Sequence, residues 1–169
     1  MVLQRKINTA DKKGVIFMKK LYVVTGANGH LGSTILRKLI QSGEKVRGLI
    51  LPAESPFFPE EAEYVKGDVT DVDSLRPLFS NPDNAELVFI HTAGIISIAD
   101  EVTEALLKVN VEGTKNLLAL ALENKVRRFV YVSSVHAIPE RPLHVLEETD
   151  SFSEEEVHGA YAKTKALAT

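Results

Sequence analysis

Cysteine is absent from this sequence, and its absence excludes several kinds of chemistry at once. Without cysteine the chain can form no disulfide, offers no thiolate nucleophile and supplies no thiolate ligand to a metal. Three of the five histidines, His91, His136 and His158, fit no standard zinc spacing, so we predict no metal site. A chain without cysteine is also compatible with the cytosol, and we expect a cytoplasmic protein.

Long apolar runs and long basic runs are missing as well. No apolar run approaches the roughly 20 residues of a membrane span, so we expect no membrane partner. The net charge of −3 and the lack of a basic run argue against a nucleic-acid partner. With 169 residues, 44% of them hydrophobic and 25% charged, the chain is long enough for one sizeable core and too short for two full domains.

Residues 1–17 are polar, have no clear periodicity and lack the apolar centre of a secretory signal. We predict that they form a disordered leader or tag, and that one domain spans residues 18–169. An extra edge strand over residues 15–17 is the alternative.

The domain is organised around a glycine-rich stretch. Residues 21–24 predict a strand, the turn that follows contains Gly26, Gly29 and Gly32, and residues 31–41 have apolar side chains at helical spacing. Rossmann-type domains hold a dinucleotide with this order of elements, because backbone N–H groups and the positive helix end face the pyrophosphate. Glycine is needed where a Cβ would block that close approach. Three glycines alone would fit an ordinary turn equally well, so the rest of the chain must decide.

Strand and helix patterns alternate along the rest of the domain. They predict strands at residues 44–51, 63–69, 86–91 and 128–134, and helices at residues 71–80, 100–124 and from 160 onward. The pattern at 100–124 fits either two helices or one helix that contains Gly113. Asp71 or Asp73 can cap the helix at 71–80, and Pro77 should distort it. The alternation predicts an α/β fold, a Rossmann-type doubly wound parallel sheet in three α/β/α layers, with ligands at the carboxyl ends of the strands.

Five motifs follow one another in a fixed order. They are the turn from Thr25 to Gly32, Gly67-Asp68-Val69, His91-Thr92-Ala93-Gly94, Asn110-Val111-Glu112-Gly113-Thr114 and Tyr161-x-x-x-Lys165, with Tyr131-Val132-Ser133-Ser134 before the last. The ordered set resembles the extended short-chain dehydrogenase/reductase family, which includes NAD-dependent epimerases/dehydratases and dihydroflavonol-reductase-like enzymes. The resemblance covers residues 18–169. It implies a cofactor, NAD or NADP, and a small-molecule substrate.

The resemblance also implies roles for individual residues. Tyr161 would be the general acid/base, Lys165 on the same helix face would favour the tyrosinate and hold the nicotinamide ribose, and Ser134 would position the substrate. Ser133 is a close rival of Ser134, because a one-residue slip at a strand end reverses the side that a residue faces. Asp68 resembles the adenine contact, and Asn110 the structural asparagine beside the active site. The predicted cofactor-binding residues are Gly26, Asn28, Gly29, His30, Leu31, Gly32, Asp68, Val69, Thr92, Ala93, Gly94, Asn110 and Lys165.

Two departures from the family pattern bear on cofactor and substrate. The end of the second strand normally selects NAD through an acidic residue or NADP through an arginine, whereas this chain has Leu51 and Pro52 there. Arg47 lies earlier in the strand, so the choice between NAD and NADP stays open. Sugar-nucleotide epimerases commonly continue from the serine into Val-Tyr-Gly, but this sequence reads Val135-His136-Ala137. The departure favours a carbonyl reductase over a sugar-nucleotide epimerase or dehydratase, with His136 as a candidate lining residue of the substrate pocket.

Length is the largest departure, because family members are about twice as long as this chain. We therefore predict a substrate domain beyond Thr169, and weak dinucleotide binding with little turnover by the 169-residue chain alone. A non-catalytic dinucleotide-binding protein is the competing hypothesis, since a fold does not fix a function. The resemblance also implies a homodimer through the helices around residues 100–124 and 160–169.

Overall fold

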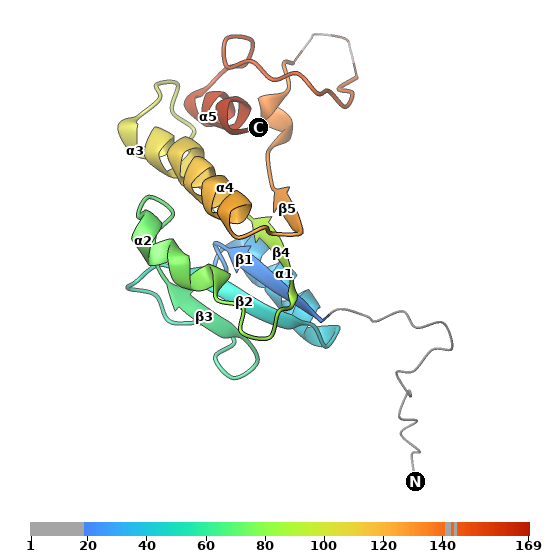
Figure 1. Cartoon of the computed structure of the whole chain (residues 1–169). Helices are drawn as coiled ribbons and strands as arrows, with labels where there is room; N and C mark the ends of the chain where they lie inside the picture. Colours follow the sequence, from blue (N-terminus) through green and yellow to red (C-terminus); the bar gives the residue numbers. More distant parts are fainter. Residues whose placement is uncertain (1–18, 141–142, 144) are drawn as a thin grey trace, which may run out of the picture.

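The structure is a computed structural model that describes residues 19–140, 143 and 145–169 (Figure 1). The predicted leader at residues 1–17, with its edge-strand alternative, lies outside the described residues and stays a prediction.

Five strands form one parallel sheet, as the alternating pattern predicts. The strands are β1 (Lys20–Thr25), β2 (Lys45–Ile50), β3 (Glu63–Lys66), β4 (Glu86–His91) and β5 (Arg128–Tyr131), in the order β3-β2-β1-β4-β5. Every neighbouring pair is parallel. The order reverses direction between β1 and β4, and a doubly wound sheet binds its ligand in the crevice at such a reversal.

Helices cover both faces of the sheet. They are α1 (His30–Gln41), α2 (Val72–Leu75), α3 (Glu104–Leu106), α4 (Gly113–Glu123) and α5 (Ala160–Ala168), joined by 3-10 segments at Arg76–Phe79 and Val135–Ala137 and a π-helical turn at Leu107–Glu112. Figure 1 shows α2 and α4 on one side of the sheet and α1 on the other. The predicted three-layer Rossmann-type architecture is confirmed.

The two faces of the sheet bury separate apolar clusters. Val23 of β1 packs in the cluster that contains Phe89 of β4 and Leu117 of α4. The next residue, Val24, packs in a second cluster with Leu36 of α1. Successive side chains of a strand point to opposite faces, so β1 contributes to both clusters and fixes α1 and α4 on opposite sides.

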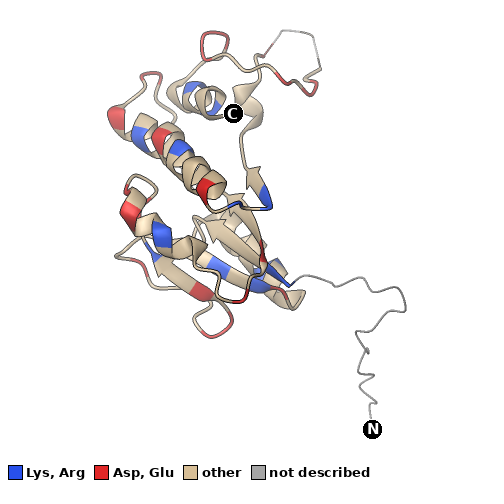
Figure 2. Cartoon of the chain, in the orientation of Figure 1, with Lys and Arg blue, Asp and Glu red and all other residues tan. Residues whose placement is uncertain are grey.

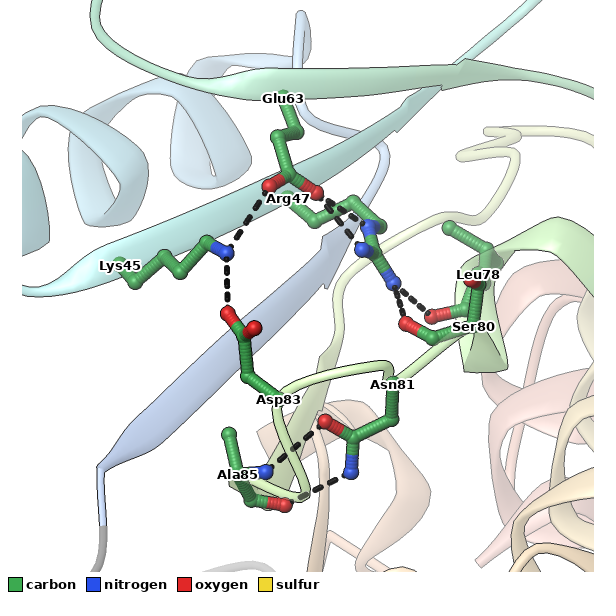
Figure 3. A network of polar contacts seen from close by, with 8 residues as sticks. All are labelled: Lys45, Arg47, Glu63, Leu78, Ser80, Asn81, Asp83 and Ala85. Atoms are coloured by element: carbon green, nitrogen blue, oxygen red, sulfur yellow. Dashed lines mark hydrogen bonds and ion pairs between the residues drawn. The ribbon is translucent and has the colours of Figure 1, made fainter.

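Arg47 joins β2 to β3 and to the segment before β4 (Figure 3). Its buried guanidinium donates to the Glu63 carboxylate, with Nη2 and Oε2 2.6 Å apart, and to the carbonyl O atoms of Leu78 and Ser80 at 2.8 and 2.7 Å. Burial alone would raise the pKa of Glu63, but Arg47 and then Lys45 outweigh it and lower that pKa below its usual value. The Arg47 side chain is therefore committed to the sheet and is not a cofactor selector.

Three strands are shorter than predicted. β2 spans Lys45–Ile50 instead of residues 44–51. β3 ends at Lys66 instead of residue 69, because Gly67 turns closely against Ser74, where a Cβ would lie 2.8 Å from the Ser74 carbonyl O. β5 ends at Tyr131 instead of residue 134, because Ser134 caps the following 3-10 segment.

The predicted helices also divide differently. Asp71 caps α2 as expected, but Pro77 has no N–H to continue an α-helix, so the chain goes on as the 3-10 segment Arg76–Phe79. The helical pattern predicted from residue 100 begins only at Glu104, where Thr103 caps it, and then forms α3, a π-helical turn and α4 in direct succession. Gly113 begins α4, where a Cβ would lie 2.6 Å from Cγ2 of Val69.

Charged side chains of both signs alternate along α3, the π-helical turn and α4 (Figure 2). Glu104 pairs with Lys108 at 2.7 Å and Glu112 with Lys115 at 2.8 Å, as i,i+4 and i,i+3 neighbours. Within the described residues no helix is both long and apolar enough to cross a bilayer, and no three His, Asp or Glu side chains gather in a way that could hold a metal ion.

Candidate functional site

The glycine-rich turn lies against the end of β4. Gly26 has a φ of +65°, and a Cβ at this residue would lie 3.0 Å from the backbone N and Cα of Ala93. Gly32 has still less room, because a Cβ there would lie 2.1 Å from the carbonyl O of Gly26. Glycine is required at both positions for the turn to close. The structure thus brings together the predicted residues Gly26, Gly29, Gly32, Thr92 and Ala93.

The first turn of α1 presents backbone donors beside this glycine-rich turn. Gly29 is the N-cap residue, so no side chain caps the N–H groups at the start of the helix, and the first turn holds no acidic residue. Asn28 donates through Nδ2 to the carbonyl O of Ser55 at 2.9 Å. Its Oδ1 is buried and has no hydrogen-bond partner in the described part of the chain. Open donors at a positive helix end suit a phosphate group, and the buried Oδ1 is an acceptor left for a ligand.

A buried chain of hydrogen bonds links the turn to the helix that follows β4. Thr25 Oγ1 accepts from two backbone N–H groups at the end of β4, both at 3.2 Å. The same oxygen lies 2.6 Å from Nδ1 of His91, and Nε2 of His91 lies 3.0 Å from Oγ1 of Thr114. Thr114 donates to the carbonyl O of Asn110 at 2.7 Å. We call this set, Thr25, His91, Thr114 and Asn110, the buried relay.

The bonding pattern of the buried relay assigns its protons. The hydroxyl hydrogen of Thr114 points to Asn110, so Thr114 Oγ1 accepts from Nε2–H of His91. Nδ1 of His91 is then an acceptor and takes the hydroxyl hydrogen of Thr25. Burial, together with the charge of Lys165, lowers the pKa of His91 to about 3. His91 is therefore a neutral ring that holds two elements together, and it takes no part in proton transfer near neutral pH.

Asn110 stands in the π-helical turn and connects three segments. Its Oδ1 accepts from the backbone N–H of Ile95 at 2.8 Å, and its Nδ2 donates to the Ile95 carbonyl O at 2.9 Å and to Oγ1 of Thr164 at 3.0 Å. Gly94 packs beside it, since a Cβ on Gly94 would lie 3.1 Å from Asn110 Oδ1 and 3.7 Å from Nζ of Lys165. Single π-helical turns occur frequently at functional sites, because the extra residue re-aims a side chain.

Lys165 of α5 reaches the carboxyl end of β5. Its side chain is buried, and Nζ donates to the carbonyl O of Val132 at 2.9 Å and to the hydroxyl of Tyr131 at 3.2 Å. The same Nζ lies 4.7 Å from the ring centroid of Tyr131 and 5.9 Å from that of Tyr161. Burial lowers the pKa of Lys165 to about 8. Burial also raises the pKa of Tyr131 to about 12, so this hydroxyl keeps its proton beside Lys165.

The two candidate serines have different partners. Ser133 Oγ lies 2.5 Å from Oγ1 of Thr169, which in turn donates to the carbonyl O of Lys165 at 2.7 Å. Ser134 Oγ accepts from the backbone N–H of His136 at 3.2 Å and keeps its own hydroxyl hydrogen for another partner. Among the described residues no hydrogen bond joins Ser134 to Tyr161 or Lys165.

The predicted adenine contacts have structural partners. Asp68 Oδ1 accepts from the backbone N–H of Thr70 at 2.9 Å and from its hydroxyl at 2.8 Å, which makes a compact turn after β3. Val69 is buried in the same apolar cluster as Phe89. Neither contact excludes an adenine beside this turn, and the role of Asp68 stays a prediction.

Sequence reasoning missed three residues of this site. Tyr131 is the last residue of β5. A side chain with a hydroxyl group at the carboxyl end of a strand could have been recognised from the sequence as a candidate site residue. Thr25 and Thr114 belong to quoted motifs, but their pairing through His91 depends on the β1–β4 register, in which Thr25 stands opposite His91.

Fold and site together define the class of extended short-chain dehydrogenases/reductases, so the resemblance noted in the sequence is confirmed. A model of the 3-beta hydroxysteroid dehydrogenase/isomerase family matches residues 23–169, and the chain belongs to this family.

Individual relatives agree with this membership. Sterol demethylase protein B from Methylococcus capsulatus is 34% identical over 148 residues, which cover 86% of this chain and 44% of that protein. A putative dihydroflavonol 4-reductase from Synechocystis is 32% identical over 156 residues, covering 90% of this chain and 44% of that protein. The solved structure of a short-chain dehydrogenase/reductase superfamily protein from Agrobacterium tumefaciens with bound NAD has a TM-score of 0.69 at 29% identity, and the match covers 88% of this chain and 42% of that one. The chain thus spans less than half the length of each of these three proteins.

Proposed function

We propose that this chain is the dinucleotide-binding part of an NAD(P)-dependent oxidoreductase that moves hydride between the nicotinamide and a carbonyl or alcohol carbon of a small-molecule substrate. One observation carries the proposal: Lys165, Asn110 and Gly94 converge at the carboxyl end of the sheet, with Tyr161 on the same helix as Lys165. This is where a doubly wound fold binds its ligand.

The residues present fit a dinucleotide. Gly26 and Gly32 add no side chain of their own to the turn between β1 and α1, and the uncapped N–H groups of α1 suit a pyrophosphate. The buried Oδ1 of Asn28 supplies a free acceptor beside the same turn. The NAD bound in the Agrobacterium tumefaciens protein supports the same cofactor class here. When bound, the nicotinamide supplies or accepts the hydride.

The side chains then have the following roles. Tyr161 gives a proton to the substrate oxygen during reduction and takes it back during oxidation. Lys165 places its Nζ 5.9 Å from the ring centroid of Tyr161 and would hold the nicotinamide ribose. Ser134 keeps its hydroxyl hydrogen for the substrate oxygen. Asn110 fixes the segment at Ile95 and, through Thr164, the helix that carries Tyr161 and Lys165.

Replacement of Tyr161 by Phe tests this assignment. The variant keeps the ring and its packing but removes the proton donor, so turnover should fall roughly 10²- to 10⁴-fold while NADH or NADPH affinity stays unchanged. The measurement is dinucleotide oxidation with a panel of ketones, aldehydes and 3β-hydroxysteroids, alongside fluorescence titration of the dinucleotide. Tyr22→Phe, on β1, is the matched control. Unchanged turnover in Tyr161→Phe overturns the catalytic role, and dinucleotide binding without turnover in the wild type supports the non-catalytic alternative.

The experiment is run on the 169-residue chain and on any longer chain that contains it. The chain spans less than half the length of the relatives it matches, and our prediction for the 169-residue chain is weak dinucleotide binding with little turnover. Tight binding and fast turnover by the 169-residue chain would contradict that prediction.

We also propose a homodimer through α4 and α5 and a cytoplasmic location. Leu118 and Leu122 of α4 and Leu167 of α5 are exposed large apolar side chains, which supports a contact surface there. The absence of cysteine supports the location. Sedimentation of the wild type against Leu122→Lys tests the dimer, and cell fractionation tests the location.

A further inference from the structure

The loop that follows β2 brings an acidic side chain back to the strand end. Glu54 donates its backbone N–H to the carbonyl O of Leu51 at 3.0 Å, and its carboxylate Oε2 accepts from the backbone N–H of Leu51 at 2.9 Å. These two bonds close the turn at residues 51–54 and place the Glu54 carboxylate over the carboxyl end of β2. In the sequence Leu51 follows β2 directly, whereas in the structure the carboxylate of Glu54, three residues later, lies at the end of that strand.

The same carboxylate lies beside the glycine-rich turn. Nδ2 of Asn28 is 3.5 Å from Oε2 of Glu54, and it also donates to the carbonyl O of Ser55 at 2.9 Å. The turn itself is tied to β2, because the backbone N–H of Ala27 donates to the carbonyl O of Leu49 at 3.0 Å. The Glu54 carboxylate, the Asn28 amide and the end of β2 therefore share one corner of the sheet. The second oxygen of Glu54, Oε1, takes part in no hydrogen bond with the described residues.

We infer that Glu54 selects NAD over NADP by accepting a hydrogen bond from the 2′-hydroxyl of the adenosine ribose. This inference rests on the proposed function. In a Rossmann-type fold the ribose of the adenosine lies at the end of β2, next to the glycine-rich turn. A carboxylate there accepts from a hydroxyl, and it repels a 2′-phosphate that carries close to two negative charges. The buried Oδ1 of Asn28, which lacks a partner in the described residues, offers an acceptor for a donor of the same ligand.

A cationic side chain near this corner would favour a 2′-phosphate and so oppose the effect of Glu54. Arg47 is turned away and held by Glu63 and two backbone carbonyls. Arg37 of α1 lies over the ring of Phe58, with its guanidinium carbon 5.8 Å from the ring centroid. Lys66 ends β3 and donates through Nζ to the carbonyl O of Pro52 at 3.1 Å. Lys66 is thus the rival group, because an exposed ammonium near Pro52 would favour a 2′-phosphate.

The test measures binding of the wild type and three variants to NADH and NADPH by fluorescence titration. ADP-ribose and its 2′-phosphate serve as probes without nicotinamide. Glu54→Gln keeps the size of the side chain and an acceptor for Leu51 but removes the charge. Glu60→Gln, an exposed acid in the same loop, is the matched control. Lys66→Met removes the rival cation.

We expect the wild type to bind NADH and ADP-ribose at least tenfold more tightly than their 2′-phosphorylated counterparts. In Glu54→Gln the NADH affinity should fall roughly tenfold and the NADPH affinity should rise several-fold, because a hydrogen bond to a charged acceptor and a charge repulsion are both lost. Glu60→Gln and Lys66→Met should keep the wild-type preference.

Three results count against the inference. Equal or tighter binding of NADPH by the wild type overturns it, as does a preference that Glu54→Gln leaves unchanged. A loss of NADPH binding in Lys66→Met assigns selection to the lysine instead. Failure of the wild type to bind any of the four ligands overturns the proposed function itself, and with it the assignment of Glu54. Thermal melting of Glu54→Gln, expected at the wild-type temperature, separates a change of selectivity from a loss of folding.

Discussion

Replacing Lys165 by Met should make the protein more stable at neutral pH while removing its ability to hold a dinucleotide. The Lys165 side chain is buried, and burial lowers its pKa from 10.5 to about 8. Each pKa unit corresponds to about 1.4 kcal/mol, so the buried charge costs at most about 3 kcal/mol, and about 2 kcal/mol once solvent near the crevice screens it. Methionine has a similar length and carries no charge.

The replacement also removes two hydrogen bonds. The carbonyl O of Val132 and the hydroxyl of Tyr131 lose the Nζ donor, and we expect this loss to cost about 1 kcal/mol. At pH 7 the charge term exceeds the hydrogen-bond term, so the free energy of unfolding of Lys165→Met should be higher than that of the wild type by about 1 kcal/mol.

The sign of the pH dependence follows from the lowered pKa. Between the folded-state value of about 8 and the unfolded value of 10.5, the unfolded chain binds a proton that the folded chain does not, so wild-type stability rises with pH across this window. The cost of the buried charge is present in full below pH 8 and disappears toward pH 10.5. The variant has no such term. Its advantage of about 1 kcal/mol should therefore become a deficit of similar size by about pH 10.

Urea unfolding followed by circular dichroism at several pH values between 7 and 10 measures this difference. Other titrating groups are common to both proteins and cancel when the two curves are subtracted. Lys163→Met, two residues away on α5, is the control and should show no comparable change. A stability difference between wild type and Lys165→Met that stays constant from pH 7 to pH 10 would refute the reasoning. Retained NADH affinity in the variant would refute the ribose-binding role.

Two other substitutions test the residues that hold the sheet and the glycine-rich turn in place. Arg47→Met should lower the free energy of unfolding by about 3 kcal/mol, since the buried carbonyl O of Leu78 and the carboxylate of Glu63 lose the guanidinium donor. Lys45→Met, on the exposed side of the network, should change little, and chemical denaturation measures both. Gly32→Ala should cost about 2 kcal/mol or more and abolish dinucleotide binding, because its Cβ meets the carbonyl O of Gly26. Gly43→Ala, with φ of +75° and open space around it, should cost about 1 kcal/mol and keep binding, so equal binding in both glycine variants would contradict the close-packing argument.

Much of the fold could be predicted from the sequence, because apolar periodicity and turn residues report local structure directly. The parallel sheet and the capping role of Asp71 followed from such local patterns. The π-helical turn could not be predicted, since one extra residue in a helix leaves an apolar pattern that still reads as helical. The early end of β5 could not be predicted either, because it depends on whether Ser134 pairs with a neighbouring strand or caps the next segment.

Some residues of the candidate site could likewise be predicted from the sequence, and others could not. Gly26, Gly32, Asn110 and Lys165 carry recognisable spacing, and the structure places the first two in the turn and the last two beside Gly94. The carboxylate of Glu54 could not be assigned to the end of β2, because it arrives there through a turn whose closure the sequence does not specify.

The buried relay couples the end of β1 energetically to α4, through His91 of β4. Nε2 of His91 donates and Nδ1 accepts, while each threonine hydroxyl both donates and accepts. No member can therefore rotate to a new partner without leaving a neighbour unpaired in the interior. Losses at Thr25 and Thr114 should therefore not add, because both residues bond to the same His91 ring. The glycine-rich turn after β1 and the helix after β4 are therefore coupled by polar contacts that an apolar pair of the same size would not reproduce. The position of that turn depends in part on Thr114, which lies on the other side of the His91 ring.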